Sequence, residues 1–76
     1  SENPTSIGTI YPNPTRSNLT IQTNDVIYAV DIYNAAGLLI QSETKNTFSV
    51  ENLPAGIYFL KIQTENGIGT SRFVKE

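Results

Sequence analysis

Short runs in which apolar and polar residues alternate, separated by turn-forming residues, dominate this chain of 76 residues. Residues 19–23 place an apolar side chain at every second position, which is the period of a strand with one buried face. Phe48 and Val50 repeat the same spacing. No window free of proline and glycine has the i, i+3, i+4 and i+7 apolar spacing of an amphipathic helix. The pattern therefore predicts an all-β fold.

Strand alternation also predicts which side chains face the core. In the third run, the even positions Tyr28, Val30 and Ile32 alternate with positions that include Asp31, so we expect the even set to point inward. Residues 58–63 are dense in aromatic and β-branched side chains, as expected of a central strand. The apolar positions of matching parity predict one core shared between two sheets, made of Leu19, Ile21, Val30, Ile32, Val50, Leu53, Tyr58, Leu60 and Ile62.

Turn-forming residues punctuate the strands at intervals of about 8–12 residues. The pair Asn66-Gly67 tolerates positive φ and predicts a type I′ turn between two antiparallel strands. Residues 34–37 predict a type I turn that Gly37 closes in a left-handed conformation. Residues 12–14, Pro-Asn-Pro, must end or edge any sheet because proline has no amide donor. In a chain this short, six to seven strands fit an immunoglobulin-like antiparallel β-sandwich better than a barrel.

The composition excludes several classes of function. The chain has no His and no Cys, which rules out thiolate catalysis, disulfides, the usual zinc sites and histidine-activated nucleophiles. The net charge is −2 and no apolar run approaches the roughly 20 residues of a membrane span. We therefore expect no enzyme activity, cofactor, metal, nucleic-acid partner or membrane insertion. The basic residues are scattered along the chain at Arg16, Lys45, Lys61, Arg72 and Lys75.

Residues 53–58, Leu-Pro-Ala-Gly-Ile-Tyr, form the most informative local pattern. In immunoglobulin-like sandwiches, a tyrosine at the start of a central strand often bonds through its hydroxyl to backbone a few residues upstream. The spacing of Leu53, Gly56 and Tyr58 allows that corner. An ordinary turn followed by a core tyrosine fits the spacing equally well. We also expect Gly56 to adopt a backbone angle, or a close approach, that a Cβ would strain.

Several motifs occur together in an order that resembles one known family. They are Tyr11, Pro12, Asn13 and Pro14 near the start, residues 30–33 followed by Gly37, the block 53–62 with Leu53, Gly56 and Tyr58, and the closing residues 72–75. This set resembles the C-terminal sorting domain of type IX (Por) secretion system cargo from Bacteroidetes. The resemblance covers about residues 10–76. Leu38 departs from it, because many members carry Lys or Arg just after the turn glycine.

The resemblance implies a compact sandwich of seven strands at the end of a larger secreted protein. Such a domain directs its attached passenger through an outer-membrane translocon, after which a surface sortase-like peptidase usually removes the domain. The implied partners are the translocon, that peptidase and an N-terminal passenger of the same polypeptide. The implied location, after passage through the periplasm and outer membrane, is the cell surface or the extracellular space.

The extreme C-terminus is important for export in the family, which points to a recognition segment made of Arg72, Phe73, Val74, Lys75 and Glu76. These residues could also form a last strand with a solvated end, and the two interpretations are compatible. Lys75 and Glu76 are expected to be surface positions. For residues 11–14, a structural role is favoured over direct contact with a receptor.

Residues 1–8 are interpreted as a linker from an upstream passenger, and residues 9–76 as the sorting domain. An alternative for residues 1–6 is that they hold or adjoin the processing site. Two other functions stay open: a carbohydrate-binding or fibronectin-like accessory module, and a passive spacer. Sugar binding would be favoured by an exposed coplanar set of aromatic side chains, for which the candidates are Tyr28, Tyr33, Tyr58 and Phe59.

Overall fold

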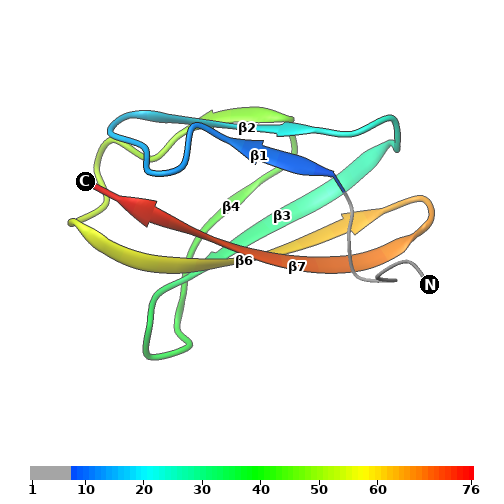
Figure 1. The fold of residues 1–76 in the computed structure, drawn as a ribbon. Helices are drawn as coiled ribbons and strands as arrows, with labels where there is room; N and C mark the ends of the chain where they lie inside the picture. The colour runs from blue at the N-terminus through cyan, green and yellow to red at the C-terminus, as the bar shows by residue number, and fades with distance from the viewer. Residues whose placement is uncertain (1–7) are drawn as a thin grey trace, which may run out of the picture.

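The computed structural model describes residues 8–76, which form seven strands and no helix. The strands are β1 (Thr9–Tyr11), β2 (Asn18–Gln22), β3 (Ile27–Tyr33), β4 (Leu39–Glu43), β5 (Thr47–Ser49), β6 (Gly56–Thr64) and β7 (Gly67–Lys75). They build a three-stranded sheet, β1-β2-β5, and a four-stranded sheet, β4-β3-β6-β7. All strand pairs are antiparallel, and the two sheets lie face to face (Figure 1). The predicted all-β sandwich is confirmed, and the described residues contain no helix suited to crossing a membrane.

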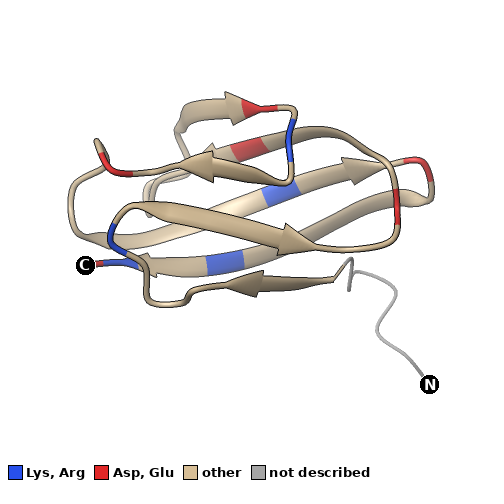
Figure 2. Cartoon of the chain, turned by 90° about the horizontal axis from the view of Figure 1, so that it is seen from above, with Lys and Arg blue, Asp and Glu red and all other residues tan. Residues whose placement is uncertain are grey.

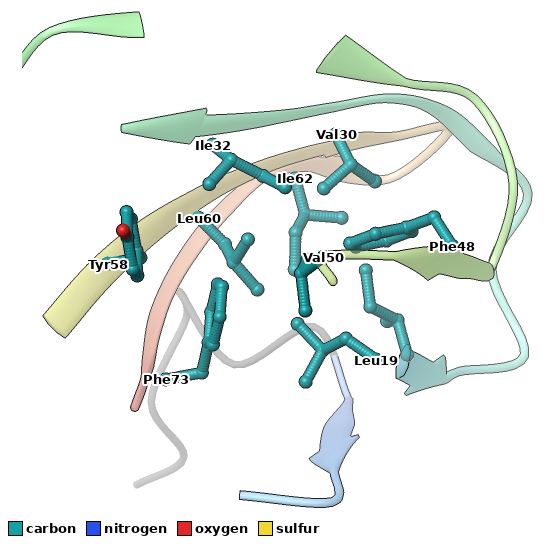
Figure 3. Packing of buried hydrophobic residues seen from close by; sticks show 10 residues of the cluster. Leu19, Val30, Ile32, Phe48, Val50, Tyr58, Leu60, Ile62 and Phe73 are labelled. Atoms are coloured by element: carbon teal, nitrogen blue, oxygen red, sulfur yellow. The ribbon is translucent and has the colours of Figure 1, made fainter. Parts of the chain in front are cut away.

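One apolar core fills the space between the sheets (Figure 3). Every predicted core residue is buried except Leu53, which is half-buried and packs against the cluster. Two phenylalanines outside the predicted core also belong to it: Phe48 from β5 and Phe73 from β7, the latter fully buried. The Phe73 ring stacks on that of Tyr58, with 5.5 Å between the ring centroids. The last strand therefore contributes to the centre of the core.

The expected inward orientation of Tyr28 is wrong, because this side chain is 61% exposed. The register between β3 and β6 shifts here: Ile27 lies opposite Thr64, and Ala29 lies opposite Gln63. The shift leaves Tyr28 without a partner in β6, as at a β-bulge, and the alternation of side chains changes across it. Ile27, rather than Tyr28, therefore packs against the core.

Gly37 closes the turn between β3 and β4 in a left-handed conformation, as predicted. Gly37 has a φ of 87°, and its N–H donates to the Asn34 carbonyl at 2.9 Å. The Asn34 side-chain oxygen accepts from the N–H groups of Ala36 at 2.9 Å and of Leu38 at 3.0 Å. The asparagine and the glycine thus satisfy the backbone of the turn together, and Leu38 extends from it as an exposed residue.

The hairpin between β6 and β7 is antiparallel as predicted, but its turn is not type I′. A type I′ turn needs positive φ at both central residues. The loop consists of Glu65 and Asn66, because Thr64 pairs with Gly67, and every described residue with positive φ is a glycine. Gly67, with a φ of 132°, takes the unusual angle just after the loop. Asn66 instead donates its side-chain amide to Asp25 Oδ1 at 2.7 Å.

We expect Leu60→Ala to destabilise the domain by about 2–5 kcal/mol, since Leu60 is 1% exposed and its truncation leaves a cavity. Ile57→Ala is the matched control in the same strand, because Ile57 is 46% exposed and should cost less than about 1 kcal/mol. Chemical unfolding of both variants measures the difference. An unchanged midpoint for Leu60→Ala would contradict the burial.

Candidate functional site

The proline-rich motif and the end of the chain meet at one edge of the sandwich. After β1, the chain leaves the three-stranded sheet, and Thr15 forms a parallel bridge with Lys75 of the four-stranded sheet. The Thr15 N–H donates to the Val74 carbonyl at 2.9 Å, and the Glu76 N–H donates to the Thr15 carbonyl at 2.8 Å. We call this contact between residues 13–16 and residues 72–76 the terminal clasp. Figure 2 shows the C-terminus beside the loop that follows β1.

Asn13 takes the place of a strand partner in the terminal clasp. Its Oδ1 accepts from the Val74 N–H at 3.0 Å, and its Nδ2 donates to the Arg72 carbonyl at 3.4 Å. The flanking residues Pro12 and Pro14 have no backbone N–H to offer β7. An amide side chain between them supplies both a donor and an acceptor. This geometry supports the structural role favoured for residues 11–14.

Two further residues complete the terminal clasp. Thr15 is 2% exposed, and its hydroxyl donates to the carbonyl of Asn18. Arg16 Nε lies 3.2 Å from Glu76 Oε1, and both side chains are well exposed to solvent. An ion pair this exposed adds about 0–1 kcal/mol, so the backbone bonds of Thr15 carry more of the contact.

The predicted recognition segment alternates between the core and solvent. Phe73 and Lys75 are buried, whereas Arg72, Val74 and Glu76 are exposed. The segment is a last strand, which ends at Lys75. The expectation that Lys75 is a surface position is wrong: it is 7% exposed, because it occupies the same inward parity as Phe73. Its Nζ donates to the Glu76 carbonyl at 3.2 Å, so the charged end still has a polar partner.

The tyrosine corner is present. The Tyr58 hydroxyl donates to the Pro54 carbonyl at 2.5 Å, while the ring is buried against Phe73. Gly56, just before this tyrosine, has a φ of 153°, and a Cβ placed on it would have no neighbour within 4 Å. The backbone angle, rather than a close approach, therefore favours glycine at this position.

The aromatic candidates for a sugar platform do not form one exposed set. Tyr58 is buried, while Tyr28 lies at the bulge of β3. Tyr33 and Phe59 do lie opposite each other in the register of β3 and β6. The acidic residues of positions 8–76 form no group of three or more that could hold a metal ion. The terminal clasp brings together two of the sequence motifs, the proline-rich residues 11–14 and the closing residues 72–75.

We expect Gly56→Val to destabilise the domain by about 1–3 kcal/mol, since valine strongly disfavours this φ. Ala55→Val, at the adjacent exposed position, is the control for added side-chain bulk. Thermal melts followed by circular dichroism compare the two variants. Coincident melts of Gly56→Val and the unmodified chain would show that glycine is merely tolerated there.

Asn13→Ala should cost about 1–2 kcal/mol, because it leaves the Val74 N–H and the Arg72 carbonyl without their side-chain partner. Asn52→Ala, at another exposed asparagine, is the matched control. Amide hydrogen exchange at Val74 provides a local measurement, and it should accelerate in Asn13→Ala alone. Equal exchange in both variants would mean that Asn13 does not hold the last strand.

Comparison with known proteins identifies the family of this chain. The model of a family described as "Secretion system C-terminal sorting domain" matches residues 9–76, which is nearly the whole chain. A search of curated proteins finds no match. Nothing in these findings favours the carbohydrate-binding alternative, and a family of sorting signals points to a non-catalytic role for the domain. The chain belongs to the family of type IX secretion C-terminal sorting domains, signals that direct an attached passenger protein across the outer membrane.

Proposed function

We propose that the type IX translocon recognises the folded terminal clasp through the outward side chains of residues 72–76. The observation that carries this proposal is that the end of the last strand, from Arg72 onward, is held along both edges. One edge of β7 pairs with β6, and the other bonds to Asn13 and Thr15. The end of the chain is therefore presented as a fixed surface, and a receptor that binds it need not order a flexible tail.

Strand alternation divides the recognition segment into two roles. Phe73 and Lys75 point inward and hold the fold, so they do not offer their side chains to a partner. Arg72, Val74 and Glu76 point outward and present a cation, an apolar group and an anion in sequence. Val74 also lies opposite the exposed Ile57 of β6, which extends the apolar part of the surface.

The role of the domain as a sorting signal implies two further partners, a passenger protein and a peptidase. A passenger would precede the domain on the same polypeptide, and a surface sortase-like peptidase would cut between the two after export. The passenger would then reach the cell surface or the extracellular space, with no catalysis by the domain itself. The linker predicted at residues 1–8 and the alternative processing site at residues 1–6 lie outside the described residues, apart from Gly8.

Gly8 is the first described residue, and it already lies close to the sandwich. A Cβ added to Gly8 would lie 2.2 Å from the Gln22 carbonyl oxygen. Contacts this short do not occur, so a larger residue would force the backbone of β2 or of residue 8 to shift. The passenger would thus connect to a chain that is held against β2 from Gly8 onward.

Export of a fluorescent reporter tests the proposal. Residues 1–76 are fused to the end of a periplasmic reporter in a bacterium with a type IX system, and the surface-exposed fraction is measured. The variant R72Q/V74T/E76Q should lose surface delivery. Its melting temperature should change little, because each exposed substitution moves stability by less than about 0.5 kcal/mol.

The matched control is V26T/K45Q/E51Q, which removes the same kinds of side chain from exposed positions elsewhere. It should be delivered like the unmodified fusion. Normal delivery of R72Q/V74T/E76Q would overturn recognition through these side chains. Equal loss of delivery in both triple variants would also count against the proposal, since the effect would not depend on the terminal clasp.

A further inference from the structure

A shallow groove of about 490 Å³ lies on the outer face of the four-stranded sheet. Its lining combines two aromatic side chains, Tyr33 and Phe59, with two cations, Lys61 and Arg72. Tyr33 lies opposite Phe59 in the register of β3 and β6, and Phe59 lies opposite Arg72 in that of β6 and β7. Tyr33, Phe59 and Arg72 therefore form one row across three strands, with the two aromatic residues next to the cation.

The cations of this groove lack carboxylate partners. Among residues 8–76, a single ion pair is present, and it joins Arg16 to Glu76 at the terminal clasp. Asp31 lies opposite Lys61 in the register, but its Oδ1 accepts a hydrogen bond from Ser42 Oγ at 2.9 Å and forms no ion pair with the lysine. Lys61 and Arg72 outnumber this one carboxylate, so the groove carries an excess of positive charge on a chain whose net charge is −2.

The spacing of the two cations matches the repeat of an extended peptide. Lys61 lies opposite Thr70, and Arg72 follows two residues later in β7, so the two cations are diagonal neighbours. Diagonal neighbours in a sheet are about 7–8 Å apart. Side chains at positions i and i+2 of an extended peptide are about 7 Å apart on one face. Carboxylates at alternate positions of a peptide strand therefore fit this pair of cations.

The edge of β7 beside the groove is open to pairing. The terminal clasp covers the edge from Arg72 onward, whereas no other described strand pairs with residues 67–71 on that side. The N–H and the carbonyl of Val74 point toward the terminal clasp. Because backbone groups alternate in direction along a strand, the N–H and carbonyl groups of Ile68 and Thr70 point to the same side, away from β6. Residues 67–71 contain no charge and no proline, the features that commonly protect edge strands.

We propose that this edge and groove bind an acidic peptide segment in an extended conformation. The peptide pairs with β7 at residues 68–70 and directs alternate Asp or Glu side chains toward Lys61 and Arg72. Main-chain pairing supplies affinity, and the spacing of the cations selects acidic residues at every second position. The inference shares Arg72 with the proposed recognition surface, whereas Lys61 and the open edge at residues 67–71 lie outside the terminal clasp, so peptide binding is tested separately from export.

A blocked eight-residue peptide of alternating Glu and Thr is the probe, and calorimetry and amide chemical shifts of the 76-residue chain are the measurements. We expect the largest shifts at the amides of Ile68 and Thr70, and weaker binding at higher salt. K61Q/R72Q should weaken binding on the order of tenfold. K45Q, which removes an exposed cation elsewhere, should bind like the unmodified chain.

Thr70→Pro tests the pairing itself, because it removes an outward N–H that makes no bond to β6. It should abolish binding, and a melt establishes that it folds; if it does not, K61Q/R72Q carries the test alone. The proposal is overturned by equal binding of a Lys-Thr peptide, by shifts located at β4, or by no binding at about 1 mM peptide. Sedimentation as a dimer joined through β7 would also overturn it, since a second copy would then occupy the edge.

Discussion

The pairing of β7 with β6 is the constraint on which the rest of the structure depends. Nine consecutive residue pairs, from Gly56 opposite Lys75 to Thr64 opposite Gly67, run without a register shift. This unbroken register fixes the parity of the last strand, so that Phe73 reaches the core and stacks on Tyr58. It also leaves the other edge of β7 free for residues 13–15, which close the sandwich there.

Alternation in the sequence is enough to predict the buried face of a regular strand whose apolar residues share one parity. Val30 and Ile32 are buried as expected, but the same rule fails at Tyr28 because a bulge shifts the register, and a bulge depends on the partner strand. The predicted type of the turn after β6 is wrong for a related reason. The pair Asn66-Gly67 permits a type I′ turn, but the pairing of Thr64 with Gly67 moves the loop back by one residue.

The candidate site is only partly visible in the sequence, because its two halves are far apart in the chain. Residues 11–14 show that the chain is rigid at that point, yet nothing local indicates that Asn13 binds Val74, 61 residues away. The sequence also does not show which side chains of the last strand face the core. Phe73 and Val74 are adjacent apolar residues, so alternation does not decide which one is buried. The resemblance to a family located the site, and the pairing of β7 assigned its residues to core and surface.

The side chains of β7 alternate between buried and exposed positions. Shortening the chain therefore cannot remove a recognition surface on this strand without also disturbing the fold. Removing residues 73–76 would delete the Phe73 ring from the core and the backbone partners of Thr15 together with any contact surface. Small domains have only a few kcal/mol of net stability, so such a loss would unfold much of the population. A receptor that reads Arg72, Val74 and Glu76 in their folded arrangement therefore also senses whether the domain has folded, since the three side chains share one rigid surface only while β7 is paired on both edges.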